Sequence, residues 1–289
     1  MKALLICPSF RPAVPLLAVD GPLALTPILG ECIVSHWIEH VVSLGARQVR
    51  VIAADRAGQV RAALGDGARW GVELEVIAAG AEPTRAEAAA HYQAAGGAGW
   101  LPAPHDIVVM NHLPGRAEHP LFESYASWFA ALLAWMPLAL TPARVRVSEL
   151  VPGIWVGRRA HVSATAKLIA PCWIGDQVFV EPGATIGPGA ILEDRSVVEK
   201  ETLITLSWIG CDTFVGPMMS VSSSLAWGNT LTNWRTDSSL HVPDPFLLCS
   251  LSPATATADH APARAKVSPP ALAPWTAPPR RVSNSHPAN

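Results

Sequence analysis

Residues 156–221 read VGRRAHVSATAKLIAPCWIGDQVFVEPGATIGPGAILEDRSVVEKETLITLSWIGCDTFVGPMMSV, and this stretch decides the fold. An aliphatic residue recurs at every sixth position, and a mostly small residue stands four places after each one. A helix repeats every 3.6 residues and a simple strand every 2, so neither explains a period of six. The spacing predicts a coil of short strands in which each repeat sends one side chain into a common interior. The aliphatic positions are Val156, Val162, Leu168, Ile174, Val180, Ile186, Leu192, Val198 and Ile204, and after a slip of one residue at Ile209 the pattern resumes at Val215 and Val221.

This pattern resembles the hexapeptide-repeat family, whose members form a left-handed parallel β-helix. Glycine or another small or polar residue often follows the aliphatic position, as in Val156-Gly157 and Ile174-Gly175. The resemblance implies a left-handed β-helix at about residues 150–225, which would follow an α/β domain at about residues 1–145.

The composition limits the classes of protein to consider. Of the 289 residues 50% are hydrophobic and only 15% are charged, with a formal net charge of −2. Because the chain has no basic excess, we expect no nucleic-acid partner. The five scattered cysteines lack metal-type spacing and fit the reduced thiols of a cytoplasmic protein. The apolar run from Ala126 to Leu140 is too short for a bilayer and contains Pro137, so we expect no membrane span.

The first 113 residues alternate between strand and helix patterns. Short aliphatic runs predict strands, and apolar residues at helical spacing predict helices. The alternation predicts βαβ units, and therefore a Rossmann-like, mostly parallel sheet with helices on both faces. The predicted strands span residues 4–7, 48–53, 72–77 and 107–110, and the predicted helices span residues 31–43, 57–64, 82–95 and 121–135.

Residues 64–74 carry a more specific likeness. They read LGDGARWGVEL, which resembles the G-D-G-x-x-W/F-G-V segment of sugar-1-phosphate nucleotidyltransferases. Residues 25–30, LTPILG, resemble a second segment of that family, L-x-P-V-x-G. The resemblance covers residues 1 to about 113, and C-terminal hexapeptide repeats are common in the same family. It implies transfer of a nucleotidyl group from an NTP to a sugar 1-phosphate, with magnesium, on a Rossmann-like sheet.

The triphosphate loop of that family is replaced in this chain. In the family, glycines after the first strand let backbone N–H groups approach the triphosphate, and an arginine meets its charge. Here the strand leads into Cys7-Pro8-Ser9-Phe10-Arg11-Pro12, which contains neither glycine. Arg11 is a candidate anion ligand, and the alternative is an ordinary surface arginine.

The remaining catalytic positions are replaced as well. The family's phosphate-binding lysine falls at Pro22-Leu23, and its base-binding loop at residues 83–88 lacks the Gly-Thr pair. Its metal-binding aspartate falls at Leu113, which cannot coordinate magnesium. Asn111 and His112 keep polar groups beside that position and are candidate ligand-binding residues. We therefore expect no metal site, and magnesium is implied only if nucleotidyltransferase activity remains.

The length of the connection to the repeats supports the same conclusion. Leu113 and Leu150 are 37 positions apart, which leaves room for one helix and loops but not for the family's sugar-binding subdomain. Phosphoryl-type transfer depends on positioning and charge neutralisation, which the missing parts supply. We expect an inactive relative that kept the scaffold.

The repeats and the segment after them hold further candidates. Hexapeptide acyltransferases use a histidine as general base, for which His161 and His241 are weak candidates; the alternative for His161 is an exposed corner. The segment at about residues 226–251 is either a cap that closes the coil or a sugar or phosphate site, with Trp234 as stacking face and Arg235 as anion partner. Residues 252–289 are rich in Pro, Ala, Ser and Thr and predict a disordered tail.

Three functions remain open on the sequence. The leading one is a non-catalytic nucleotidyltransferase-like protein, a binding or regulatory subunit in sugar-nucleotide or cell-surface polysaccharide metabolism. Its expected ligand is a sugar nucleotide or sugar phosphate, and its expected partner is a second copy or a related active subunit. The second is an enzyme, either a residual nucleotidyltransferase or an acyltransferase. The third is a structural oligomerisation module.

Overall fold

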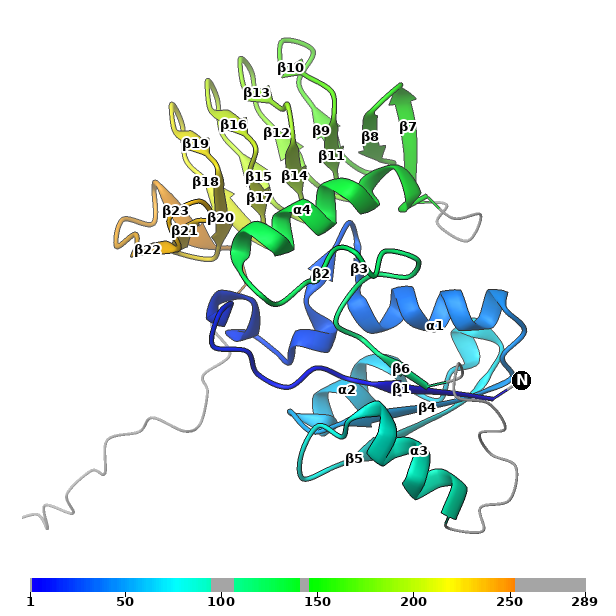
Figure 1. Ribbon diagram of the computed structural model, residues 1–289. Coiled ribbons are helices and arrows are strands. Elements are labelled where there is room, and N and C mark those ends of the chain that lie inside the picture. Colours follow the sequence, from blue (N-terminus) through cyan, green and yellow to red (C-terminus); the bar gives the residue numbers. More distant parts are fainter. Residues whose placement is uncertain (1, 95–106, 141–145, 253–289) are drawn as a thin grey trace, which may run out of the picture. The chain divides into compact units, whose positions relative to one another are not determined.

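The N-terminal part of the chain is built on a four-stranded parallel sheet in the order β5-β4-β1-β6 (Figure 1). The computed structural model describes residues 2–94, 107–140 and 146–252. Central strand β1 pairs in parallel with β4 and β6, and β4 pairs in parallel with β5. All four strands lie within two residues of their predicted bounds. They are β1 (Lys2–Ile6), β4 (Gln48–Ala53), β5 (Glu73–Ala78) and β6 (Ile107–Val109).

Helices pack on both faces of this sheet. Because strand side chains alternate between faces, Leu5 and Val51 fall in one hydrophobic cluster with side chains of α1 (Ile33–Ser43) and α2 (Ala57–Leu64). Leu4 falls in another cluster with Ala88 of α3 (Arg85–Ala94). The predicted alternation of strands and helices is therefore present, and the prediction for α2 matches its observed bounds.

A tight hairpin precedes α1. Two short 3-10 helices, η1 (Pro15–Ala18) and η2 (Leu23–Leu25), lead into the antiparallel pair β2 (Pro27–Ile28) and β3 (Glu31–Cys32). The two turn residues, Leu29 and Gly30, both have positive φ, 51° and 81°. Two positive φ values are typical of the type I′ turn that joins strands most tightly. Leucine adopts this backbone conformation at a steric cost, so other contacts must stabilise the turn.

Helix α4 (Tyr125–Trp135) begins four residues later than the predicted helix at 121–135. Ser124 sets the start, since its Oγ accepts from the N–H of Ser127 at 3.0 Å while Ser127 Oγ accepts from the N–H of Ser124 at 3.0 Å. This capping box satisfies backbone donors that have no partner inside the helix. The prediction from apolar residues alone was therefore wrong at this end. In the described part of the chain no helix has the length and hydrophobicity to cross a membrane.

The repeats form short parallel strands stacked in three sheets (Figure 1). Val156 pairs with Ile174, and Ile174 pairs with Leu192, so equivalent positions in successive coils lie 18 residues apart. The predicted aliphatic positions form one hydrophobic cluster inside the coils. The first sheet contains β8 (Ile154–Gly157), β11 (Cys172–Ile174), β14 (Ala190–Leu192), β17 (Trp208–Ile209) and β20 (Ser224–Trp227); the second contains β9 (His161–Val162), β12 (Phe179–Val180), β15 (Val197–Val198) and β18 (Thr213–Val215); the third contains β10 (Lys167–Leu168), β13 (Thr185–Ile186), β16 (Leu203–Thr205) and β19 (Ser220–Ser222).

Antiparallel strands lie at the two ends of the stack. Strand β7 (Val147–Val151) pairs with β8. After the last coil, β21 (Thr230–Asn233) and β22 (Ser238–His241) extend the first sheet, and β23 (Leu248–Ser250) pairs with β18. The segment expected as a cap thus continues two sheets in antiparallel form. Of the predicted tail at residues 252–289, all but the first residue lie outside the described part of the chain.

The outward side of the first coil sheet is apolar and packs on α4. Trp155, Trp173 and Trp208 stand at its outward positions and are at most 5% exposed. Trp128 of α4 meets Trp208 edge to face, with ring centroids 6.5 Å apart. These side chains belong to the same hydrophobic cluster as α1 and the parallel sheet. The coils and the N-terminal part therefore share one core.

We predict that Gly175→Ala lowers the free energy of unfolding by about 1–3 kcal/mol, the usual range for an overpacked core. An added Cβ would lie 2.6 Å from Asp194 Oδ1 and 2.8 Å from its backbone nitrogen. Gly58→Ala in α2 is the control, because no atom lies within 4 Å of its added Cβ and alanine favours a helix by up to about 1 kcal/mol. Denaturant unfolding of both variants measures the difference, and equal effects would contradict close contact between coils.

Candidate functional site

The sheet order marks the carboxyl ends of β1 and β6 as the expected ligand crevice. The chain leaves β1 toward β4 on one side and later reaches β6 on the other. Open parallel sheets bind ligands where the strand order reverses in this way. Here Cys7, Met110 and Leu113 follow the strands and are at most 2% exposed. Burial raises the pKa of the Cys7 thiol well above its ordinary value, so the thiol is uncharged. Apolar side chains therefore fill the crevice.

Arg11, the candidate anion ligand, is paired within the chain. Its Nη2 donates to both carboxylate oxygens of Glu82 at 2.8 Å, and its Nη1 donates to the carbonyl of Ser9 at 3.1 Å. The backbone N–H of Ser9 donates to the same carboxylate at 2.8 Å. Glu82 thus occupies the position that a bound anion would take against this loop.

The other positions named from the family resemblance also serve the fold. Leu23, at the phosphate-lysine position, and Leu113, at the metal-aspartate position, are 0% exposed. Thr84, in the base-binding loop, donates from its N–H and Oγ1 to Glu87 at 2.8 and 2.9 Å. Magnesium requires hard oxygen ligands, so the apolar side chain of Leu113 at the metal-aspartate position does not fit the ion. Among the residues that the structure describes, no group of three or more His, Cys, Asp or Glu could hold a metal.

A cavity of about 400 Å³ beside β6 brings Asn111 and His112 together with α1; we call it the β6 groove. Trp37 Nε1 donates to the carbonyl of His112 at 2.8 Å, and the two rings meet edge to face with centroids 5.2 Å apart. The ring of His40 meets the same indole at 5.7 Å. The lining consists of Trp37, His40, Val41, Leu44, Arg85, Ile107, Val108, Val109, Asn111 and His112.

Two imidazoles, one amide and the guanidinium of Arg85 give the β6 groove its chemistry. Nδ1 of His112 donates to the carbonyl of Leu113 at 2.9 Å, so Nε2 is the ring nitrogen left to bond a ligand, as an acceptor without a proton or as a donor with one. Burial lowers the pKa of His40, which favours its neutral form. Asn111 is exposed and offers both a donor and an acceptor. Such groups bind hydroxyls and phosphate oxygens, while an indole offers apolar surface.

The two candidate histidines lie apart from each other and from the β6 groove. His161, on β9 at one end of the stack, is exposed and stacks on Phe179 with ring centroids 4.8 Å apart. His241 ends β22 at the other end and is also exposed. The structure does not bring them into one site, and the role of each as a general base remains a prediction.

Trp234 and Arg235 contact each other, but Trp234 also packs against α4. Its ring stacks on Phe129 with centroids 5.1 Å apart, and its Nε1 donates to the carbonyl of Leu206 at 2.9 Å. The guanidinium of Arg235 lies 5.2 Å from the centroid of the same indole. These contacts use surface that a stacked sugar would need, so they favour a cap over a ligand site.

The sequence reasoning missed Glu193, whose side chain is buried where the hairpin meets the coil. Its Oε1 accepts from the N–H of Leu29 at 2.7 Å and from Trp208 Nε1 at 3.0 Å. Its Oε2 accepts from the N–H of Gly30 at 2.8 Å. Because two donors belong to the tight turn between β2 and β3, the carboxylate stabilises that turn. Burial raises the pKa of Glu193 to about 7, although its hydrogen-bond donors oppose this shift.

Glu193 stands at a position where three other coils have glycine. The residue after the inward aliphatic position is glycine in three other coils, and a Cβ there would lie within 2.4 to 2.7 Å of a neighbouring coil. Those glycines are Gly157, Gly175 and Gly210. The side chain of Glu193 therefore extends away from the coil, where its carboxyl group meets the turn of the β2–β3 hairpin.

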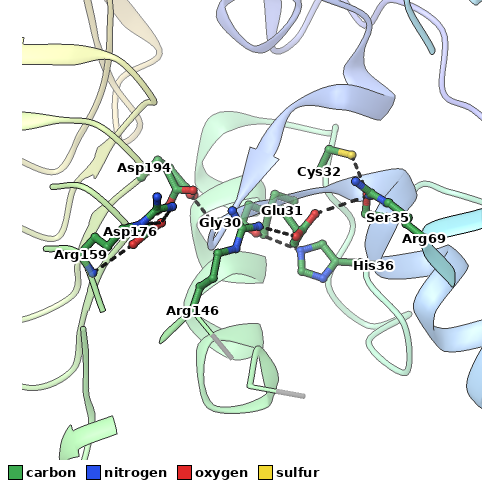
Figure 2. A network of polar contacts seen from close by, with 12 residues as sticks. Gly30, Glu31, Cys32, Ser35, His36, Arg69, Arg146, Arg159, Asp176 and Asp194 are labelled. Carbon is green, nitrogen blue, oxygen red and sulfur yellow. Dashed lines mark hydrogen bonds and ion pairs between the residues drawn. The ribbon is translucent and has the colours of Figure 1, made fainter. Parts of the chain in front are cut away.

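A polar network surrounds the same joint (Figure 2). Glu31 of β3 accepts from Arg146 at 3.0 Å and lies 3.8 Å from Arg69. On the coil side, Asp194 accepts from the backbone N–H of Asp176 at 2.8 Å. Figure 2 shows Arg146 reaching toward Glu31 from the segment before β7. Charged groups on the hairpin and the coil turns are thus paired rather than open to an added ligand.

We predict a pH-dependent contribution of Glu193 to stability. Because burial raises its pKa from 4.5 to about 7, folding takes up a proton between these values. The contribution is complete below pH 4.5 and is lost as the pH rises through 7, by about 3 kcal/mol at most. Urea unfolding of wild type and Glu193→Gln should therefore give a stability difference that falls over this range. Exposed Glu181→Gln should leave the pH profile unchanged, and a difference that grows with pH would contradict the raised pKa.

Comparisons with known proteins find likenesses among solved structures. No protein-family model and no curated protein sequence matches the chain. Among solved structures, it is similar to a histidine-to-asparagine mutant of perosamine N-acetyltransferase from Caulobacter crescentus, in complex with CoA and GDP-perosamine. The match has 15% sequence identity and a TM-score of 0.19, and it covers 62% of this chain and 92% of that one.

Proposed function

We propose that this protein is a nucleotidyltransferase-like, left-handed β-helix protein that binds a sugar phosphate or sugar nucleotide without transferring a nucleotidyl group. It acts as a binding or regulatory subunit in sugar-nucleotide or cell-surface polysaccharide metabolism. The observation that carries the proposal is the β6 groove, where Asn111 and His112 meet Trp37 and His40.

The absence of transfer chemistry rests on charge. A nucleotidyl transfer site must neutralise the charge of a triphosphate, and it does so with backbone donors, basic side chains and a metal. Arg11 carries an internal counter-ion in Glu82. Leu113, at the position of the family's metal-binding aspartate, is 0% exposed, and so is Met110 at the end of β6. These groups leave neither positive charge nor space for the reacting phosphates.

The ligand class rests on the shape and polarity of the β6 groove. A sugar ring combines hydroxyls with an apolar face, and a phosphate adds acceptor oxygens. Trp37, fixed by its bond to the His112 carbonyl, is 5% exposed and contributes only a small part of its indole to the lining. The aliphatic Val41 and Leu44 lie next to it in the lining. His40, His112 and Asn111 supply donors and acceptors within the same cavity. Polar groups that converge on partly apolar walls are the usual form of a small-molecule site.

We predict that the purified protein releases no pyrophosphate above background. The assay supplies each NTP with magnesium and a panel of hexose 1-phosphates, and an active sugar-1-phosphate nucleotidyltransferase run in parallel is the positive control. The expected result follows from the apolar side chains at the ends of β1 and β6. Turnover at ordinary enzyme rates, about 1 s⁻¹ or more, would contradict the proposed loss of activity.

We predict that hexose phosphates or sugar nucleotides bind, and that His112→Ala weakens their affinity about tenfold, the loss of one hydrogen bond to a charged group. The substitution keeps the backbone carbonyl that Trp37 requires, so the groove wall should stay in place. His241→Ala is the matched control, since His241 is exposed at the far end of the coil stack. Isothermal titration calorimetry measures all three proteins. Equal affinities for wild type and His112→Ala would place the ligand outside the β6 groove.

A further inference from the structure

The second coil sheet carries an exposed apolar column. His161 pairs with Phe179, Phe179 with Val197, and Val197 with Phe214. Strand β23 extends this column by pairing Cys249 with Phe214. The alternate residues of these strands point into the coil core, so the column points outward. Phe179 is 44% exposed although its strand, β12, is paired with a neighbour on each side.

Charged columns flank the apolar one on the same face. Residues two places before and two places after these outward residues lie in the turns that flank the short strands. The column before it carries two arginines and one aspartate, and Arg195 in it is exposed; the column after it carries two glutamates, and Glu181 in it is exposed. Arg195 binds Asp212 through Nε and Nη2 at 2.7 and 2.6 Å, so its Nη1 is not used in that pair. The first, called the basic column because its arginines outnumber its aspartate, is Arg159, Gln177, Arg195 and Asp212; the second, the acidic column, is Ser163, Glu181, Glu199 and Gly216. Arg159 is paired with Asp176 through Nε and Nη2.

The other two coil sheets do not share this pattern. The outward tryptophans of the first sheet are covered by α4. The outward column of the third sheet is mixed and mostly polar, and consists of Lys167, Thr185, Leu203 and Ser220. Within the described part of the chain, the second sheet is thus the coil face that is apolar at its centre and not covered by a helix.

We propose that this face binds a second copy of the chain, related by a two-fold axis that runs along the apolar column. Rotation about that axis exchanges the two sides of the face. The basic column of one copy then lies opposite the acidic column of the other, so that Arg195 faces Glu199 of the second copy and Gln177 faces its Glu181. A two-fold axis parallel to the strands would instead place each charged column opposite the same column of the second copy.

The physical terms agree with this arrangement. Burial of Phe179 and Phe214 supplies the driving force, and the flanking charges select the orientation. A two-fold contact of one patch with itself is the commonest form of self-association. The face spans only a few short strands, which is small for a permanent interface, so the dimer is reversible. The contact is independent of any ligand in the β6 groove.

Sedimentation velocity over a concentration series tests whether this face dimerises. We expect a reversible dimer for wild type, and for Phe179→Glu a dissociation constant raised at least tenfold. Leu203→Glu is the matched control, because Leu203 is 39% exposed at an outward position of the third sheet; it should dimerise as wild type does. A monomeric wild type, or equal effects of the two substitutions, would overturn the proposal.

Crosslinking tests the axis. In a Cys249→Ser background, Val197→Cys places a thiol on the proposed axis, where it faces the same thiol of the second copy. Thr185→Cys places a thiol on the third sheet instead. A short bismaleimide, which adds one thiol to each of its two double bonds, spans the roughly 10 Å between packed sheets. Covalent dimers are expected from Val197→Cys at least tenfold in excess of Thr185→Cys. Similar yields from both variants would exclude this axis.

Discussion

In-register parallel pairing between successive coils is the constraint on which the rest of the structure depends. It places equivalent residues 18 positions apart directly above one another, as Val156, Ile174 and Leu192 are. A spacing in the sequence therefore becomes a column in space, and each column has one environment. The tryptophan column needs a helix to cover it, and α4 does so through Trp128. A glycine column permits close approach of the turns, with no space for a Cβ at Gly175.

Glu193 shows what happens when one member of a column differs. A buried carboxylate costs several kcal/mol unless it is hydrogen-bonded, and this one accepts from three N–H groups. Two of those donors lie in a turn where Leu29 adopts a left-handed backbone. The turn is stabilised by the carboxylate, and the carboxylate is stabilised by the turn. Neither half of this joint would be favourable alone, so the hairpin and the coil are coupled by a directional interaction as well as by apolar packing.

The local elements and the coil repeat could be predicted from the sequence, and individual contacts between distant residues could not. The bounds of α2 and β4 follow from periodicity, because both depend on neighbouring residues. The start of α4 depended on Ser124, a capping signal hidden among apolar residues. In the candidate site, Asn111 and His112 could be named because they stand beside an expected aspartate. Trp37 could not, since the hydrogen bond that brings it to His112 spans 75 positions, and no pattern within α1 reports that contact.

The buried residues at the sheet crevice share one physical explanation. Once no metal or triphosphate occupies the ends of β1 and β6, an aspartate at the position of Leu113, which is 0% exposed, would be a buried charge without a partner. Leucine removes that cost and adds apolar contacts. Glu82 solves the same problem for Arg11 with an internal carboxylate. The β6 groove differs from the crevice, because polar residues line it and Asn111 among them is exposed. Packing explains the apolar crevice, which is why we propose the ligand site in the polar β6 groove beside it.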